Sequence, residues 1–241
     1  MIQRLKKYYR RQEFFPGVLG VFTNPFFFAR RGLVKNIKGV SKLVNGRMLD
    51  VGCGSKPYRE LFSFTEYIGI DIENPGHDHS NEDVDIFYDG RVIPFGDGSF
   101  DAVITNQVFE HVFTPAQFLS ELNRVLKTNG MLLLTVPFVW DEHEQPNDFA
   151  RYSSFGLRYV LQQNGFEIIS SAKSVKDFRV IFQLAILFFY KKFVTRNFWL
   201  NSVLTLILIA PLNILGLVAS KVLPDNQDLY LDNVVLAKKI S

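Results

Sequence analysis

The strongest constraint on the fold lies in residues 47–58, where an apolar run leads into a glycine turn. Asp50 stands near the end of the run, and Gly52 and Gly54 follow it in a Gly-x-Gly pattern. Glycine accepts positive φ angles and lets a ligand approach the backbone closely. A strand followed by a glycine turn and a helix is how α/β sheets hold nucleotide-like ligands. The pattern alone is weak, so its interpretation depends on what stands at the ends of the following strands.

The middle of the chain alternates between short apolar runs and amphipathic stretches, which predicts strands that alternate with helices. The runs are nearly continuous in apolar residues, as expected of parallel strands that are buried on both faces. The predicted strands are 47–52, 67–72, 84–88, 101–106, 130–136, 166–172 and 231–238. The predicted helices are 57–63, 115–127 and 154–164, the first because the proline at 57 suits the first turn of a helix.

Composition and charge narrow the class of protein. The one cysteine, Cys53, excludes an internal disulfide and is typical of a reducing compartment, and the residues after Met1 lack the pattern of a secretory signal. We therefore expect a cytoplasmic location. Residues 1–46 carry ten Lys or Arg and one acid, with aromatic residues between them. Such a segment binds an anionic membrane surface or nucleic acid, or it is a solvated basic helix that covers the domain.

Polar side chains follow the predicted strands. Asp71 ends the second strand, 21 residues after Asp50, where an acid binds ribose hydroxyls in a Rossmann-like unit. Asp89 follows the third strand, and Asn106 ends the fourth. Ligands bind at the carboxyl ends of the strands in an open α/β sheet, so these residues should line one crevice with the glycine turn. Any one aspartate would be explained equally well by a helix cap or a turn.

A series of short motifs runs in order along the same region. They are Leu49-Asp50-Val51-Gly52-Cys53-Gly54, Tyr67-Ile68-Gly69-Ile70-Asp71, Asp89 with Ile93-Pro94-Phe95, Gly98-Ser99-Phe100-Asp101-Ala102-Val103, Glu110-His111-Val112, and Leu122-Asn123-Arg124-Val125-Leu126-Lys127-Thr128-Asn129-Gly130. Together they resemble class I S-adenosylmethionine-dependent methyltransferases of the small-molecule type. The resemblance covers residues 47–173 and extends to 231–238. It implies a Rossmann-like, doubly wound α/β fold with a seven-stranded sheet in the order 3-2-1-4-5-7-6, the last strand antiparallel.

The resemblance also assigns roles in binding S-adenosylmethionine. The implied cofactor-binding set is Asp50, Gly52, Cys53, Gly54, Asp71, Ile72, Asp89, Gly90, Asn106 and Gln107. The first acid and the glycines should hold the amino-acid part, and the acid after the second strand the ribose. Ile72 and Asp89 should contact the adenine, and Asn106 and Gln107 should flank the sulfonium. One departure is Lys56, where the family often has a third glycine. That lysine either narrows the turn or places a cation near the cofactor carboxylate.

Two histidines follow the fourth and fifth strands, so their loops face the same crevice. His111 stands beside Glu110, and His143 lies in the next loop; these three residues are the predicted catalytic set. A hydroxyl acceptor benefits from a general base or a metal ion, and His143 is the predicted general base. Some related methyltransferases bind a divalent ion through Glu-x-x-Glu-His, but here the first position is Gln107, so the match is partial and we predict no metal site. A weak site of oxygen and nitrogen ligands from Gln107, Glu110, His111 and His143 stays open as an alternative. A purely structural role for both histidines is the remaining alternative.

The segment after His143 resembles a substrate lid that contains Arg151 and Tyr152. An arginine there is suited to hold a phosphate or carboxylate of the acceptor. An ion pair between Arg151 and a nearby acid is the alternative.

A long apolar insert separates the sixth and seventh strands. Residues 197–220 contain no charge and would span about 36 Å as a helix, enough to cross a bilayer. Both strands belong to one sheet, so the insert must return on the side from which it left. The other apolar segment, 178–190, is too short to be the second half of a hairpin, and Pro211 and Asn213 should interrupt the long one. We therefore expect interfacial or re-entrant helices, with a subdomain or homodimer interface as the alternative.

These regions give a predicted organisation and function. Residues 1–46 form a basic N-terminal segment, 47–173 with 229–241 the methyltransferase domain, and 174–228 the helical insert. The prediction is a peripheral or monotopic enzyme at the cytoplasmic membrane face that methylates an oxygen of a membrane-associated acceptor. The resemblance extends to bacterial enzymes of surface-polysaccharide pathways, which implies a lipid-linked sugar. A quinone or other isoprenoid is the runner-up. An RNA methyltransferase, in which nucleic acid would be the partner, and an inactive membrane-bound scaffold are further alternatives.

Overall fold

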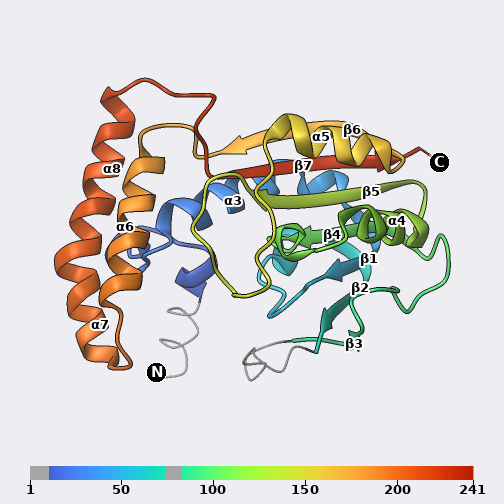
Figure 1. Cartoon of the computed structure of the whole chain (residues 1–241), viewed down its shortest axis with the longest axis horizontal. Coiled ribbons are helices and arrows are strands. Elements are labelled where there is room, and N and C mark those ends of the chain that lie inside the picture. The colour runs from blue at the N-terminus through green and yellow to red at the C-terminus, as the bar shows by residue number, and fades with distance from the viewer. Residues whose placement is uncertain (1–10, 74–82, 241) are drawn as a thin grey trace. The chain divides into compact units, whose positions relative to one another are not determined.

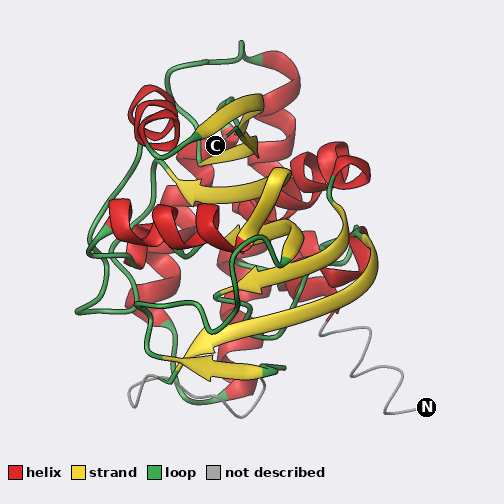
Figure 2. Cartoon of the chain, turned by 90° about the vertical axis from the view of Figure 1, so that its right-hand side faces the viewer, coloured by secondary structure: helices red, strands yellow, loops and turns green. Residues whose placement is uncertain are grey.

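The computed structural model describes residues 11–73 and 83–240. In these residues seven strands form one sheet in the order β3-β2-β1-β4-β5-β7-β6, which confirms the predicted order. Figure 1 shows β7 running opposite to β5, and Figure 2 shows the strands stacked in one twisted sheet. The strands are β1 Asn45–Val51, β2 Ser63–Ile72, β3 Ile86–Tyr88, β4 Phe100–Asn106, β5 Leu126–Pro137, β6 Phe166–Ser174 and β7 Asp232–Lys239.

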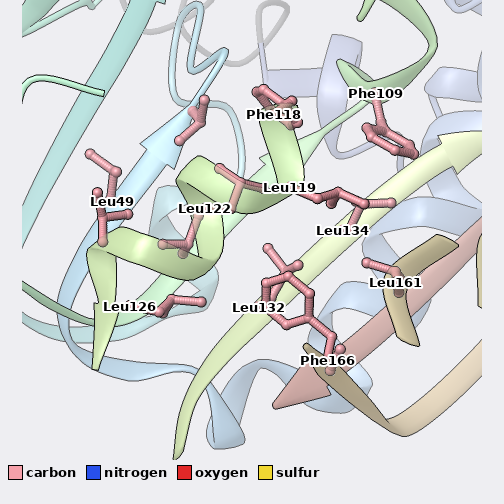
Figure 3. Packing of buried hydrophobic residues seen from close by; sticks show 14 of the residues in the cluster. Leu49, Phe109, Phe118, Leu119, Leu122, Leu126, Leu132, Leu134, Leu161 and Phe166 are labelled. Atoms are coloured by element: carbon pink, nitrogen blue, oxygen red, sulfur yellow. The ribbon is translucent and has the colours of Figure 1, made fainter. Parts of the chain in front are cut away.

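The central strands are parallel and buried. β1 pairs with β2 on one side and with β4 on the other, and β4 pairs with β5. Helices α4 (Pro115–Val125) and α5 (Ser154–Gln163) follow β4 and β5. In Figure 3 the side chains of Phe118, Leu119 and Leu122 on α4 pack among buried leucines of the strands. The core therefore lies against β1, β4 and β5, whose carboxyl ends carry the candidate site.

One predicted helix is wrong. Residues 57–63 form a single 3₁₀ turn, Arg59–Leu61, instead of a helix. The reason is the register of the sheet, because Asn45 at the start of β1 already pairs with Ser63. The chain must be extended by that residue, so only one turn fits between the glycine turn and β2.

The described chain divides into two compact units. One contains most of the sheet and covers 36–138, 142–172 and 233–240. The other, which we call the helical unit, covers 11–35, 139–141 and 173–232. Its elements are α2 (Gly20–Thr23), most of α3 (Phe27–Val40), α6 (Arg179–Phe193), α7 (Phe198–Leu204), the π-helix η5 (Thr205–Ile209) and α8 (Ala210–Val222). Figure 1 shows α6 and α8 side by side, and the two helices are in direct contact.

Two buried amides tie the N-terminal segment to the C-terminal helices of the helical unit. Gln183 Oε1 accepts hydrogen bonds from the N–H groups of Phe28 and Ala29, at 3.2 and 3.3 Å. Asn213 Nδ2 donates to the carbonyl oxygen of Val21 at 2.9 Å. The first N–H groups of a helix lack partners within the helix, so Gln183 satisfies groups at the start of α3. These bonds offset the cost of burying both amides.

The expected interruption at Pro211 is also wrong. Helix runs from α7 through η5 into α8, and Pro211 lies in the first turn of α8 just after the π-helical stretch. Proline lacks the N–H that would bond to the preceding turn. A π turn widens the helix locally and is one way for a helix to accommodate such a residue. In the described residues, one helix, Trp199–Val222, is long and apolar enough to cross a membrane, as the core helix of a soluble protein can also be.

Candidate active site

The carboxyl ends of the central strands bring the predicted cofactor residues to one edge of the sheet. Gly52 and Gly54 have φ angles of 72° and 46°, in the left-handed region that favours glycine. A Cβ on Gly52 would stand 2.3 Å from Val108, whereas no described atom lies within 4 Å of the Cβ position of Gly54. The first glycine therefore permits close packing of the turn against the segment after β4. The second leaves open space.

A cavity of about 360 Å³ opens at this edge. It is lined by Gly52, Gly54, Asp71, Ile72, Tyr88, Gly90, Gln107, Val108, His111, Val112, Phe113, Thr114, Phe118 and Glu144. Six of these belong to the predicted cofactor set, and His111 to the predicted catalytic set. The remaining lining residues, which include Tyr88, Phe113 and Phe118, were not predicted. Their only sequence signal was position, because they stand at the end of β3, in the loops after β4 and β5, or on α4.

Asp71 closes the glycine turn onto β2. One carboxylate oxygen accepts the N–H of Gly54 at 2.9 Å and the other accepts the N–H of Ile72 at 2.8 Å. The N–H groups of Gly52 and Cys53 donate to the carbonyl oxygen of Ile70. The turn is therefore held to β2 by backbone and side chain together, and Asp71 lies at the cavity wall.

Asp50 is buried behind the turn and is not among the lining residues. Tyr67 donates its hydroxyl to one carboxylate oxygen at 2.6 Å, while the other oxygen is buried without a partner in the described chain. The pKa of Asp50 is raised to about 7, chiefly by burial; the Tyr67 hydrogen bond and the charge of Lys56 oppose the rise, and the charge of Asp71 adds to it. Burial likewise raises the pKa of the Cys53 thiol, so Cys53 is a packed and unreactive group.

Of the next three cofactor candidates, Gln107 lines the cavity, whereas Asp89 and Asn106 do not. Asp89 is exposed and accepts the N–H groups of Arg91 and Val92, and these bonds lower its pKa. Asn106 ends β4, and its amide oxygen lies 3.4 Å from the hydroxyl of Thr135. Gln107 has a φ angle of 56°, and its side chain donates to the same hydroxyl at 3.2 Å.

Glu110, His111 and His143 converge, as the sequence suggested. The Nε2 atoms of His111 and His143 lie 3.8 and 4.0 Å from the same oxygen of buried Glu110. The two imidazole rings are nearly perpendicular, with centroids 4.7 Å apart. Ligand atoms of all three lie within 4.8 Å of one another, a grouping that could hold a metal ion. His111 lines the cavity and His143 does not.

Each histidine is oriented through Nδ1. His111 Nδ1 lies 2.7 Å from the carbonyl oxygen of Asn147, which can only accept, so this nitrogen carries the proton. His143 Nδ1 lies 3.3 Å from Asp148, whose pKa falls to about 2 because the bond to Arg151 outweighs the effect of burial. In both rings Nε2 is thereby left as the basic nitrogen toward Glu110.

Both predicted substrate residues, Arg151 and Tyr152, contact other side chains of the chain. Arg151 forms a two-pronged ion pair with Asp148 at 2.5 and 2.6 Å, which is the alternative that the sequence left open. Tyr152 stacks on Phe109 at 4.8 Å between ring centroids. Through Asp148, Arg151 supports His143. A direct role of Arg151 or Tyr152 toward an acceptor stays a prediction.

The sheet order, the glycine turn and the cavity at the strand ends define a class I methyltransferase fold. Residues 49–134 match the family described as "Methyltransferase domain". Residues 49–134 thus carry a methyltransferase domain of the class I, S-adenosylmethionine-dependent type.

Individual relatives agree with this family. A malonyl-[acyl-carrier protein] O-methyltransferase of Legionella pneumophila is 30% identical over 105 residues, 39% of this chain and 37% of the relative. A "probable S-adenosylmethionine-dependent methyltransferase" of Mycolicibacterium smegmatis is 33% identical over 96 residues, 37% of each chain. The chain therefore spans well under half the length of these curated relatives. The solved phosphoethanolamine N-methyltransferase 2 of Haemonchus contortus, in complex with S-adenosylmethionine, is 18% identical with a TM-score of 0.54, over 92% of this chain and 56% of that chain. This last likeness shows the fold.

Proposed function

We propose that the chain is an S-adenosylmethionine-dependent methyltransferase that methylates an oxygen atom of a membrane-associated acceptor, such as a lipid-linked sugar. The observation that carries the proposal is the cavity lined by the glycine turn, Asp71 and His111 together. It combines a site for the methyl donor with a group that can take up a proton.

The chemistry of the cavity fits S-adenosylmethionine. The glycine turn has open space at Gly54, and the unpartnered buried oxygen of Asp50 lies behind it. We propose that Asp50, Gly52 and Gly54 hold the amino-acid part, and that Asp71 binds the ribose hydroxyls. The adenine would lie against Ile72, Asp89 and Gly90, and the sulfonium near Asn106 and Gln107. Cys53 would contribute its backbone only.

The cofactor supplies a methyl group bonded to a sulfonium, and the bond's electrons stay on sulfur as it leaves. The chain's own residues have to align the acceptor oxygen in line with that bond and accept the hydroxyl proton. We propose that His111 accepts it at Nε2, because His111 lines the cavity and its Nδ1 is fixed by Asn147. The carboxylates of Glu110 and Glu144, each 3.8 Å from that nitrogen, stabilise the resulting imidazolium. His143, the base expected from the sequence, would receive the proton next or orient His111.

The helical unit supports a membrane acceptor. In the Trp199–Val222 helix only 28% of the most apolar stretch is buried. Its exposed side chains include Trp199, at 76% exposure. The other strongly exposed apolar residues of this helix are Leu200, Val203, Leu206, Ile207, Leu215, Val218 and Val222. Exposed apolar surface of this extent is typical of a membrane or protein interface. The cations Lys192 and Arg196 precede this helix in the chain and Lys221 lies in its last turn, and all three suit an anionic lipid surface.

Oxygen as the acceptor atom is supported by the name of the Legionella relative, an O-methyltransferase. A quinone or another isoprenoid shares the apolar anchor of a lipid-linked sugar and is the second candidate. An RNA acceptor would leave the exposed apolar helix without a role, and an inactive scaffold would leave the cavity without one. A homodimer through the helical unit would bury the same surface without a membrane.

The test is transfer of a radiolabelled methyl group from S-adenosylmethionine to total membrane lipid, with mass spectrometry of the labelled product. Label in lipid-linked glycans supports the proposal, and label in quinones selects the second candidate. Label only in RNA, or no calorimetric binding of S-adenosylmethionine at millimolar concentration, would refute it. Phe155→Ala is the control for substitutions in the cavity, such as His111→Asn, since Phe155 is exposed on α5 and does not line the cavity.

A further inference from the structure

Lys56 stands in the glycine turn in a conformation that is unusual for lysine. Its φ angle is 50°, in the left-handed region, and its side chain is 5% exposed. Lysine is seldom buried in this way unless its charge is paired, and a residue with a Cβ is strained at this φ. The surrounding structure therefore has to compensate for both the backbone and the buried charge.

The compensation comes from the segment that leads into β3. The ammonium of Lys56 lies 2.7 Å from Asp85 and 3.6 Å from Asp83. The same Asp85 oxygen accepts the N–H of Gly69 on β2 at 2.6 Å. Partial burial would raise the pKa of Asp85, but the bonds from Gly69 and Lys56 outweigh it and lower that pKa. One carboxylate thus joins the turn to β2.

The backbone repeats this connection. The N–H of Asp83 donates to the carbonyl oxygen of Gly54 at 2.9 Å, and the N–H of Asp85 donates to that of Gly69 at 3.0 Å. The glycine turn, β2 and the entry to β3 therefore meet around the Lys56 side chain.

The sequence leaves room for this side chain at Gly69. A Cβ on Gly69 would stand 2.3 Å from Lys56 Cε and 2.6 Å from Cys53 Sγ. The absence of a side chain on β2 is thus what lets the lysine stem lie across the strand.

Lys56 is not among the residues that line the cavity, whereas Gly52, Gly54 and Asp71 are. Its effect on a ligand must therefore pass through the turn. We infer that Lys56 is a positioning residue, which fastens the glycine turn to Asp85 and sets the amino-acid end of the cofactor site. This inference rests on the proposed function, because it assumes that the turn holds that part of S-adenosylmethionine.

The test compares two ligands on the full chain by calorimetry. S-adenosylhomocysteine carries the amino-acid part, and 5′-methylthioadenosine lacks it. Lys56→Met keeps the apolar stem and removes the charge, and Lys42→Met, at an exposed lysine, is the matched control. Loss of a hydrogen-bonded charge predicts about tenfold weaker binding of S-adenosylhomocysteine by Lys56→Met, with a much smaller change for 5′-methylthioadenosine. Lys56→Arg, which keeps the charge, should recover part of the loss.

Unchanged affinity in Lys56→Met, or an equal loss for both ligands, would overturn the inference. If that variant does not fold, Asp85→Asn replaces it, since it weakens the ion pair and leaves an oxygen for Gly69. Asp85→Asn should then weaken the binding of S-adenosylhomocysteine more than the binding of 5′-methylthioadenosine. Equal losses of affinity for the two ligands, or no loss, count against the inference. Failure of the unsubstituted chain to bind S-adenosylhomocysteine would refute the proposed function instead.

Discussion

The buried carboxyl group of Asp50 makes folding stability depend on pH in a direction that can be measured. Its pKa is about 7 in the folded chain, against 3.8 for an unperturbed aspartate side chain. Between these values the folded chain keeps a proton that the unfolded chain has lost, so stability falls as the pH rises from about 4 to about 7. Asp50→Asn removes this dependence and keeps an oxygen that can accept the hydroxyl of Tyr67.

The difference between the two pKa values sets the size of the effect. Each unit of pKa difference corresponds to about 1.4 kcal/mol. The ionised Asp50 therefore lowers the free energy of unfolding by roughly 4 kcal/mol at about pH 8. The variant should therefore be more stable than the unsubstituted chain by that order at about pH 8, and the advantage should shrink to a small fraction near pH 4.

The assay is urea unfolding followed by circular dichroism, without ligand, at about pH 5 and about pH 8. Circular dichroism is chosen because both tryptophans lie in the helical unit and would not report on Asp50. Asp225→Asn, at an exposed aspartate, controls for the general loss of a negative charge. The reasoning is refuted if Asp50→Asn shifts stability equally at both pH values, or if Asp225→Asn reproduces its pH dependence.

Three further outcomes are expected. Asp71→Ala should weaken S-adenosylmethionine binding in calorimetry about tenfold or more, because it removes the proposed ribose contact and the bond to Gly54; unchanged affinity would contradict the ribose assignment. His111→Asn should lower the rate of methyl transfer about 100-fold without changing cofactor affinity, and His143→Asn should lower that rate less. EDTA should leave the rate unchanged, and a loss of activity with EDTA would instead favour a metal at Glu110. Ile207→Asp, at an exposed residue of the apolar helix, should weaken sedimentation with anionic vesicles about tenfold, while Ile240→Asp should not; equal sedimentation of both variants would exclude this helix as the contact.

The sheet was predictable because its signals are local and repeated. The apolar runs that became β1, β4 and β5 are buried on both faces, so the sequence could hardly alternate there. The strand order came from the resemblance, since periodicity says nothing about which strands are neighbours. The helix expected at 57–63 failed because its extent depends on the register between β1 and β2. That register is a long-range property which no local pattern reveals.

The candidate site was predictable where chemistry and position coincide. Gly52, Gly54 and Asp71 stand in a recognisable order, and the structure places all three at the cavity. Phe113 was missed because an exposed phenylalanine in a loop has no pattern of its own. Lys56 was noticed only as an irregularity. Its partners Asp83 and Asp85 lie almost thirty residues away, and only the folded chain brings them together.

The two buried amides of the helical unit have a consequence for the order of synthesis. Gln183 and Asn213 bond to groups that lie 155 and 192 residues earlier in the chain. On a ribosome the N-terminal segment emerges first, but it cannot complete these bonds until α6 and α8 have been made. The helical unit therefore closes only after α8 has left the ribosome. Until then, the apolar residues around α2 and the start of α3 need another covering, and a chaperone or a membrane surface is able to provide one.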